Sequence, residues 1–156
     1  MSATVLLSLG GNLGDRKAAM DEAIRRLAAL PGVRLMARSA YYRTVPEGPI
    51  SQPWFLNIAA AVATPLSREE LVRACREIET ALGRDRRREI PWGPRIIDID
   101  VIAHGEEATI DGRAFVVIPA AEIAGSLRVG GKTLASLAAS ADRTGLEKLD
   151  WPVGAI

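Results

Sequence analysis

The 156-residue sequence has few of the residues that build disulfide frameworks, metal cages and base-stacking surfaces. Its one cysteine, Cys75, excludes an intramolecular disulfide and a cysteine-based zinc site, and fits a reducing compartment. There is one histidine, and aromatic residues make up only 4% of the chain. The formal net charge of +1 gives no global reason to expect nucleic acid or an anionic membrane as a partner.

Long apolar runs are also missing, since no segment approaches the roughly 20 apolar residues that a membrane span needs. The opening M-S-A-T-V-L-L-S-L-G-G-N has no basic region ahead of its short apolar run, unlike a secretory signal peptide. A hydrophobic content of 48% and a charged content of 25% are those of a globular protein with a real core. We therefore expect one domain over residues 1–156, cytoplasmic and monomeric, without nucleic-acid or membrane partners.

The first half of the chain alternates between strand-like and helical patterns. The turn residues after the first strand and the proline-rich loop mark where the periodicity changes. The predicted elements are a strand over 4–9, a helix from Asp15 to Pro31, a strand over 33–43, a loop over 44–53 and a strand over 54–64.

A second helix follows, because Ser67 and Glu70 match a capping box and an apolar stripe runs from there to Gly83. A strand over 96–103 completes the order β-α-β-β-α-β, which is typical of the ferredoxin-like α+β fold, an antiparallel sheet with helices packed on it. Beyond Gly105 we expect a short strand or turn over 115–118, a helix over 133–141 and a C-terminal extension.

Two aspartates interrupt the apolar strand of W-G-P-R-I-I-D-I-D, which runs from Trp92 to Asp100. Side chains alternate along a strand, so Asp98 and Asp100 share one face. Two such carboxylates repel unless protons or a cation intervene, and Mg²⁺ prefers oxygen ligands of this kind. The alternative is an edge strand with one solvated face, which for an isolated D-x-D is the more frequent case.

The preceding segment, Gly83 to Arg95, carries five arginines against two acidic residues. Guanidinium groups bind phosphate oxygens in a bidentate fork and keep their charge at physiological pH. Together with a paired-carboxylate metal site, they are the groups that phosphoryl transfer requires. A solvated basic loop is the alternative; it suits Arg87 and Arg88, while the stronger phosphate candidates are Arg84, Arg86 and Arg95.

Three other features carry less information. The run Gly10 to Gly14 lacks the spacing of a P-loop or a dinucleotide fingerprint, so a tight strand-to-helix turn explains it. His104 is the only histidine of the sequence, and we interpret it as an exposed residue without a catalytic role. Cys75 lies on the apolar stripe of a helix and is expected in the core.

The chain resembles the 6-hydroxymethyl-7,8-dihydropterin pyrophosphokinase family over roughly residues 4 to 119. The likeness rests on a series of short motifs in a fixed order, of which W-G-P-R-x-x-D-x-D is the most specific. The motifs are L-G-G-N-L-G from Leu9, Y-Y-R-T-V-P-E-G-P from Tyr41, Q-P-W-F-L-N from Gln52, I-E-x-x-L-G-R-x-R from Ile78, W-G-P-R-I-I-D-I-D from Trp92 and R-A-F-V-V-I-P from Arg113.

The resemblance implies transfer of pyrophosphate from ATP to the pterin hydroxymethyl group, with release of AMP, in folate biosynthesis. It implies two Mg²⁺ ions on Asp98 and Asp100, and catalytic roles for these two residues with Arg84, Arg86 and Arg95. The implied ATP contacts are Arg84, Arg95, Ile99, Val101 and Arg113. The implied pterin contacts are Gly10, Thr44, Val45, Pro46, Glu47, Phe55, Asn57, Trp92 and Phe115, with the pterin stacked between the two phenyl rings. Three loops, 11–15, 44–53 and 84–92, would close over the ligands.

One departure from the family pattern leaves a second hypothesis open. The family has a Pro-His pair in a hairpin ahead of the Arg-x-Phe motif, and here the segment 108–112 leads directly to Arg113. The chain could therefore be a pterin- or nucleotide-binding relative with an impaired ATP site, unless a neighbouring element fills the gap. A third hypothesis, an RNA-binding ferredoxin-like module, is disfavoured by the shortage of aromatic residues.

Overall fold

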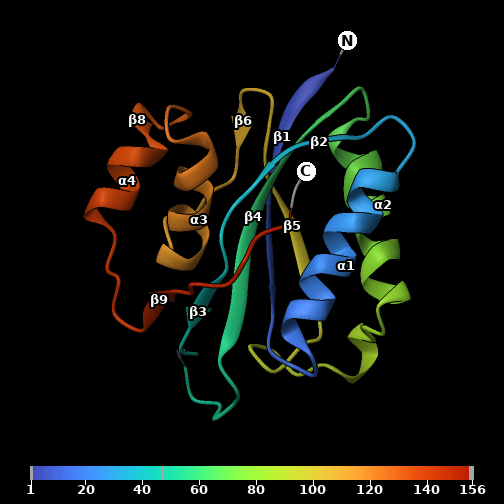
Figure 1. Cartoon of the computed structure of the whole chain (residues 1–156), viewed down its shortest axis with the longest axis vertical. Helices are drawn as coiled ribbons and strands as arrows, with labels where there is room; N and C mark the ends of the chain where they lie inside the picture. The colour runs from blue at the N-terminus through green and yellow to red at the C-terminus, as the bar shows by residue number, and fades with distance from the viewer. Residues whose placement is uncertain (1, 47, 155–156) are drawn as a thin grey trace.

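The computed structural model describes residues 2–46 and 48–154, so the predicted pterin contact Glu47 lies outside the described residues. A seven-stranded antiparallel sheet separates two pairs of helices (Figure 1). The sheet strands are β1 (Ala3–Gly11), β2 (Arg34–Arg38), β3 (Tyr42–Thr44), β4 (Phe55–Thr64), β5 (Asp98–His104), β6 (Glu107–Ala108) and β9 (Leu146–Lys148). The other elements are the helices α1 (Arg16–Ala29), α2 (Arg68–Ala81), α3 (Ala114–Ala124) and α4 (Leu134–Ser140), the 3₁₀ turn η1 (Arg86–Arg88), and the hairpin of β7 (Arg128–Val129) and β8 (Lys132–Thr133).

The strand order is β6-β5-β1-β4-β3-β9, and β2 pairs with β4 beside β3. The two central strands, β1 and β4, are the long ones, and their register runs from Ala3 opposite Thr64 to Gly11 opposite Leu56. The core order β5-β1-β4-β2/β3, with α1 and α2 as crossover helices on one face, is the one predicted from β-α-β-β-α-β. The α+β, ferredoxin-like fold class is confirmed.

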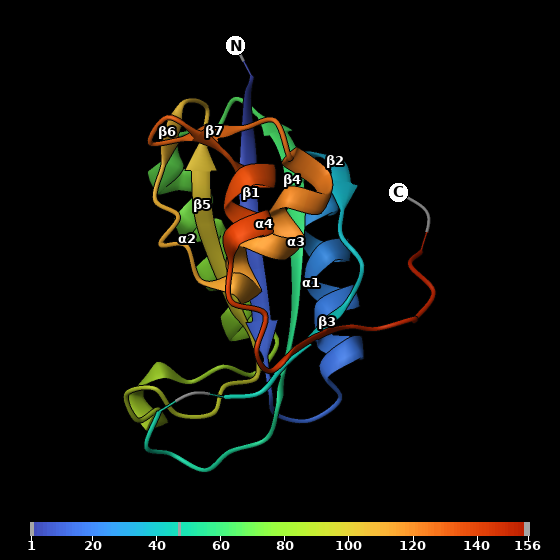
Figure 2. The same ribbon diagram turned by 90° about the vertical axis from the view of Figure 1, so that its left-hand side faces the viewer.

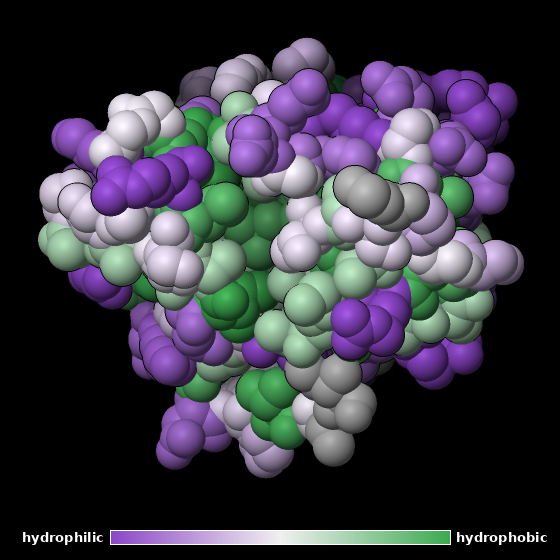
Figure 3. Space-filling view, turned by 90° about the horizontal axis from the view of Figure 1, so that it is seen from above, coloured by the Kyte–Doolittle hydropathy of each residue, from purple (hydrophilic) through white to green (hydrophobic). Residues whose placement is uncertain are grey.

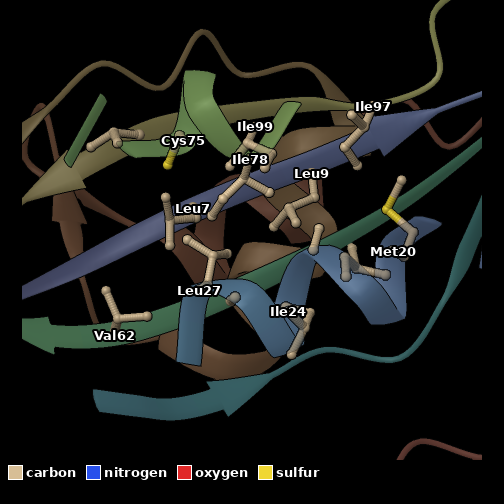
Figure 4. Close-up of a cluster of buried hydrophobic side chains, with 14 of the residues drawn as sticks. Leu7, Leu9, Met20, Ile24, Leu27, Val62, Cys75, Ile78, Ile97 and Ile99 are labelled. Atoms are coloured by element: carbon tan, nitrogen blue, oxygen red, sulfur yellow. The ribbon is translucent and has the colours of Figure 1, made fainter. Parts of the chain in front are cut away.

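The main core lies between the sheet and the helices α1 and α2 (Figure 4). Leu7 and Leu9 of β1 point into it and meet Met20 and Leu27 of α1, all fully buried. Cys75 lies in the same cluster, where burial raises the pKa of its thiol to about 12. Both predicted helix starts are confirmed: the Asp15 side chain accepts a hydrogen bond from Ala18, and the Ser67 capping box is complete.

The opposite face of the sheet is covered by α3 and α4, and here one prediction is wrong. The segment 115–118 was expected as a strand or turn, but it belongs to α3. Three β-branched residues and Pro119 conceal the helix, since both features disfavour helical structure in isolation. Five consecutive residues from Val116 to Ala120 are buried, because the helix is enclosed by the sheet and by α4 and so has no polar side to give a periodic signal. The helix expected over 133–141 is confirmed as α4.

The second predicted strand, 33–43, is divided into β2 and β3. Ser39 lies at the break, where its hydroxyl donates to the carbonyl of Ala40 and accepts from the amide of Ala59. The C-terminal extension adds β9 to the outside of β3, with Lys148 opposite Tyr42. The edge of the sheet next to the loop 44–53 is therefore built from residues 146–148, far along the chain from β3.

The connections from β1 to α1, from β3 to β4 and from α2 to β5 gather at one end of the sheet (Figures 1 and 2). These are the three loops that the sequence analysis singled out. At the opposite end, hydrophilic residues surround smaller hydrophobic areas (Figure 3). In the described part of the chain, no helix has the length and apolar character needed to cross a membrane.

Candidate active site

The two aspartates lie on the face of β5 that is turned toward α3. In the register with β1, Asp98 is opposite Gly10 and Asp100 is opposite Ser8. The alternate residues Ile99 and Val101 belong to the core cluster on the other face. A shift of register between Leu6 and Leu7 marks a bulge near Ile102, so the strand changes its alternation just beyond the carboxylates.

The arginine segment is anchored by a buried ion-pair network around Arg84, whose side chain is only 3% exposed. Arg84 makes a two-nitrogen contact with Glu89 at 2.7 and 2.9 Å, and its Nη1 lies 2.8 Å from an oxygen of Asp98. The same nitrogen is 3.1 Å from a carboxylate oxygen of Glu79. Burial alone would lower the pKa of Arg84, but its hydrogen bonds to Glu89 and Asp98 raise it above the ordinary value. In this structure the guanidinium of Arg84 is therefore bound by carboxylates and does not face an open site.

Glu79 is the acidic centre of that network and is 2% exposed. One of its oxygens accepts the backbone amide of Ile99 at 2.7 Å, and the other accepts Arg86 at 2.8 Å. Glu79 thus joins the end of α2 to the strand that carries the aspartates. We did not predict it from the sequence; the signal was an acid four residues after Cys75, at the margin of the apolar stripe.

The other two candidate arginines differ in exposure. Arg86 has a side chain that is 49% exposed, while that of Arg95 is 24% exposed and lies 3.9 Å from Asp98. The Nε atom of Arg95 is buried and has no hydrogen-bond partner among the described residues. It is a donor that an anionic ligand could satisfy. A hollow of about 460 Å³ follows this segment from Glu79 to Arg87.

Asp100 has the more open carboxylate of the pair, yet it titrates abnormally. Partial burial against the sheet, followed by the negative charges of Asp98 and Glu79, raises its pKa to about 6. Asp98 pairs with Arg84 and lies 3.9 Å from Arg95, whereas Asp100 forms no ion pair among the described residues and the charge of Arg113 only partly offsets the rise in its pKa. The positive charge is therefore concentrated on Asp98, and Asp100 is the carboxylate whose charge a divalent cation would offset.

The candidate pterin residues of the sheet lie on the same face as the aspartates. Asn57 is opposite Gly10 on one side and opposite Tyr42 on the other, and its side-chain oxygen accepts the hydroxyl of Thr44 at 2.7 Å. A Cβ atom on Gly10 would come within 2.6 Å of the Asn57 amide nitrogen. Glycine at this position is what allows the amide to lie flat against β1.

We predict that Gly10→Ala displaces Asn57 and weakens pterin binding by at least about tenfold, equivalent to about 1.4 kcal/mol. The overlap at 2.6 Å cannot be relieved without moving the amide away from β1. Calorimetric titration with the pterin would measure this. Gly154→Ala is the control, because a Cβ there meets nothing within 4 Å. Unchanged affinity in Gly10→Ala would contradict the role of Asn57.

The two candidate stacking rings come from different layers. By strand alternation Phe55 is on the α3 face with Asn57 and Ala59, and Phe115 packs from the first turn of α3 against the cluster that contains Ala59. Arg113, the helix N-cap residue, has its guanidinium carbon 4.6 Å from the centre of the Phe115 ring and pairs with Asp111 at 2.6 Å. Arg113 is exposed, and its guanidinium lies over the Phe115 ring beside the candidate pterin site.

The remaining predicted contacts are in the loops. Val45 is 54% exposed, and its amide donates to the carbonyl of Gly145 at 2.8 Å, while Pro46 is half-buried. Trp92 is 73% exposed and has a φ of +63°, a left-handed conformation. The structure therefore brings Gly10, Thr44, Phe55 and Asn57 together, and leaves the Trp92 ring in solvent at the mouth of the site.

The structure buries the side chains of Ile99 and Val101 in the core, so any contact that they make with a nucleotide must come from their backbone atoms. The carbonyl of Val101 is at the open edge of β5. Arg68 of α2 reaches this carbonyl at 3.1 Å and the hydroxyl of Thr109 at 3.3 Å. The Arg68 side chain of the neighbouring helix α2 therefore covers the edge of the sheet at the shortened segment after β5.

Among the described residues, no three His, Cys, Asp or Glu side chains converge as a metal-binding group. Two adjacent carboxylates alone suit Mg²⁺, which keeps several waters and takes further oxygen ligands from substrate phosphates. The fold and this arrangement define the class: a ferredoxin-like α+β protein whose sheet carries a carboxylate pair beside an arginine-rich loop.

Comparison with known proteins identifies the family. Residues 6–125 match the model of the 7,8-dihydro-6-hydroxymethylpterin-pyrophosphokinase family. A 2-amino-4-hydroxy-6-hydroxymethyldihydropteridine pyrophosphokinase of Methylorubrum extorquens is 45% identical, covering 92% of this chain and 97% of that protein. Its counterpart from Pseudomonas aeruginosa is 35% identical over 96% of this chain and 98% of that protein. The chain belongs to the 7,8-dihydro-6-hydroxymethylpterin-pyrophosphokinase family.

The fold has a solved counterpart in a Plasmodium falciparum HPPK-DHPS A437G/K540E with pterin and p-hydroxybenzoate, with a TM-score of 0.70 at 10% identity. The match covers 95% of this chain and 47% of that one, so the chain spans about half the length of this structure. At this identity the likeness concerns the fold alone.

Proposed function

We propose that this protein transfers the terminal pyrophosphate of ATP to the hydroxymethyl oxygen of 6-hydroxymethyl-7,8-dihydropterin, releasing AMP, as a step of folate biosynthesis. Membership of a family of pyrophosphokinases is the observation that carries this proposal. The site supports it, since an amide-reading pocket and a phosphate-binding loop meet at the carboxylate pair.

In the reaction the pterin hydroxyl oxygen bonds to the β-phosphorus of ATP, and the bond from that phosphorus to the oxygen bridging it to the α-phosphorus breaks. The hydroxyl proton is released and AMP leaves with the bridging oxygen. Phe55 and Phe115 hold the pterin ring, and Asn57 with the backbone near Thr44 reads its amide edge. These groups place the hydroxymethyl oxygen over β1, toward the aspartates.

Asp98 and Asp100 would hold two Mg²⁺ ions together with ATP, and bound metal would supply charge neutralisation at the phosphates. Arg95 and Arg86 contact the phosphates from the loop, and Arg113 contacts them from the start of α3. Arg84 orients Asp98 through their 2.8 Å contact and is available to phosphate only when Glu89 is released. Backbone atoms of Ile99 and Val101 line the nucleotide side of the site. We propose that the protein acts as a monomer in the cytoplasm.

The test is AMP release by the purified protein given ATP, Mg²⁺ and the pterin. AMP formation that requires all three components is the expected result. A folded protein that binds the pterin and forms no AMP would instead be the binding-only relative that the shortened segment raised as an alternative. The family comparisons give that alternative no support, and Arg68 closes the sheet edge where the segment is short.

We predict that Phe115→Ala weakens pterin binding by roughly 1–3 kcal/mol and nucleotide binding much less, by analogy with aromatic stacking on nucleobases. Separate titrations with the pterin and with α,β-methylene-ATP would measure both affinities. Phe115→Leu controls for lost packing against the Ala59 cluster. An equal loss for the two ligands would count against the stacking role.

We also predict that Mg²⁺ binding in the presence of α,β-methylene-ATP weakens as the pH falls below about 6, by up to tenfold for each pH unit. The raised pKa of Asp100 means that a proton competes with the metal in this range. Titration with Mg²⁺ at pH 5 to 8 would measure the dependence. The slope should flatten in Asp100→Asn, and a wild-type affinity independent of pH would refute the assignment.

A further inference from the structure

One buried amide joins all three loops around the site. Asn12, in the turn after β1, is 1% exposed. Its Nδ2 donates to the side-chain oxygen of Gln52 at 3.0 Å and to the carbonyl of Pro53 at 2.9 Å, while its Oδ1 accepts the amide of Arg95 at 2.9 Å. Its own backbone amide donates to the carbonyl of Arg95 at 2.9 Å. Both ends of the side chain are therefore satisfied, and the partners fix its orientation.

The connection continues through Gln52 to the most unusual backbone position of the molecule. The Nε2 of Gln52 donates to the carbonyl of Trp92 at 2.8 Å. Among the described residues other than glycine, Trp92 alone has a positive φ, a conformation that a residue with a large side chain seldom adopts. Its ring is 73% exposed, so packing does not impose this conformation. The turn from Ile90 to Gly93, closed by the Gly93 amide on the Ile90 carbonyl at 3.0 Å with Pro91 ahead of Trp92, sets this conformation, and the bond from Gln52 ties the turn to the loop 44–53.

The resulting path has pterin contacts on one side and phosphate contacts on the other. Gln52 and Pro53 lead directly into Phe55 on β4, and Arg95 leads directly into Asp98 on β5. Asn12 and Gln52 have no assigned contact with either ligand, so their effect on the site must pass through the loops that they join. The bonds of Asn12 are partly buried, so breaking them leaves polar groups unpaired, and the exposed bond from Gln52 to Trp92 extends this anchored network to the turn before Arg95.

We propose that Asn12 and Gln52 are positioning residues that couple the loop 44–53 (the pterin loop) to the segment from Gly83 to Arg95 (the arginine loop), so that filling one half of the site favours binding in the other. This inference rests on the proposed function. A ligand that fixes the loop 44–53 biases the position of Trp92 and Arg95, and thermodynamic linkage makes the effect reciprocal. The pterin then binds more tightly when the nucleotide is present, and the nucleotide more tightly when the pterin is present.

The decisive variant is Gln52→Glu. A glutamate keeps an oxygen that can accept from Asn12 but loses the N–H that donates to the Trp92 carbonyl, so it cuts the path at one bond. The matched control is Ser51→Glu, which adds the same charge at the neighbouring, exposed position without removing a hydrogen bond. Gln52→Met removes the bond without adding charge and serves if the glutamate variant folds poorly.

The measurement is calorimetric titration with the pterin, with and without α,β-methylene-ATP and Mg²⁺, which gives the coupling factor between the ligands. We expect a factor within the roughly 5–150-fold range of allosteric coupling in the wild type and in Ser51→Glu, and a fall of about threefold or more in Gln52→Glu and Gln52→Met. Hydrogen exchange of the backbone amides of Ile90, Trp92 and Gly93 should also be faster in the Gln52 variants.

The inference is overturned if Gln52→Glu and Gln52→Met keep the wild-type factor, or if Ser51→Glu lowers it equally. It is also overturned if the wild type binds both ligands without coupling, a result that would leave the proposed function intact. A wild type that binds neither ligand would instead overturn the proposed function, and this inference with it.

Discussion

Asp100→Asn should lower the rate of pterin-dependent AMP formation by at least about a thousandfold, equivalent to about 4 kcal/mol of transition-state stabilisation. The substitution preserves the size of the side chain and removes one negative oxygen from the proposed metal site. Charge stabilisation by a bound metal is worth several kcal/mol, so loss of one of two ligands is expected to be severe. Steady-state AMP release at saturating Mg²⁺ would measure the effect.

The same variant should fold at least as well as the wild type. The pKa of Asp100 is raised above its ordinary value, so the folded metal-free protein holds the proton more tightly than the unfolded chain does. The contribution of this carboxyl to stability is therefore present at low pH and is lost as the pH rises through about 6. Asparagine does not ionise, so the variant avoids this loss of stability at neutral pH. Thermal unfolding at pH 7.5 without Mg²⁺ would show whether the variant is at least as stable as the wild type.

The control for Asp100→Asn is Glu106→Gln, which makes the same change of charge in the exposed turn between β5 and β6. It should alter neither turnover nor stability. Asp100 is a cleaner target than Asp98, because Asp98 also pairs with the buried Arg84 and its loss would disturb that network. Wild-type turnover by Asp100→Asn would remove the carboxylate pair from the proposed mechanism.

Arg84→Met should destabilise the protein by about 3–5 kcal/mol, because it leaves buried carboxylates without their cation. Glu79 and Arg84 are 2% and 3% exposed at the side chain, so water cannot replace the lost contacts. Glu79 would keep the amide of Ile99 and the guanidinium of Arg86, while Glu89 would lose its two-nitrogen partner. Urea unfolding at neutral pH would measure the difference in the free energy of unfolding.

Arg87→Met is the matched control, since Arg87 lies in the same loop, has a side chain that is 91% exposed and, within the described ranges 2–46 and 48–154, forms an ion pair with Asp85 alone. Exposed ion pairs contribute little, so this variant should unfold at the wild-type urea concentration. If Arg84→Met were as stable as the wild type but inactive, Arg84 would be a phosphate ligand alone and the buried network would have no structural role.

The fold could be predicted from the sequence as far as local periodicity reached. The strands and helices up to residue 104 follow from alternation, capping residues and turn formers, apart from the division of 33–43 into β2 and β3. Both hydrogen bonds of the predicted capping box at Ser67 are present. The helix α3 could not be predicted in this way. It is buried on several sides, so its sequence lacks the alternation of apolar and polar residues that indicates a helix, and Pro119 disfavours a helix as well.

The site could be predicted where it consists of residues on one strand, and not where it depends on contacts across the fold. Asp98 and Asp100 follow from a two-residue spacing. The burial of Arg84 and the roles of Glu79 and Asn12 depend on which segments meet in space. No local sequence pattern around these residues indicates those contacts. The arginine-rich segment itself indicated Arg84, Arg86 and Arg95, the resemblance to the family added Arg113 and the stacking positions, and their ligand contacts remain predictions.

The pairing of β9 with β3 has a consequence for the order in which the protein is completed during synthesis. The amide of Val45 donates to the carbonyl of Gly145, and the amide of Leu149 donates to the carbonyl of Tyr41, so the outer edge beside the loop 44–53 depends on residues translated well after β3. The central strands and the helices α1 and α2 can assemble on the ribosome before that segment emerges. A nascent chain would then carry its carboxylate pair before the sheet edge beside the candidate pterin site is finished.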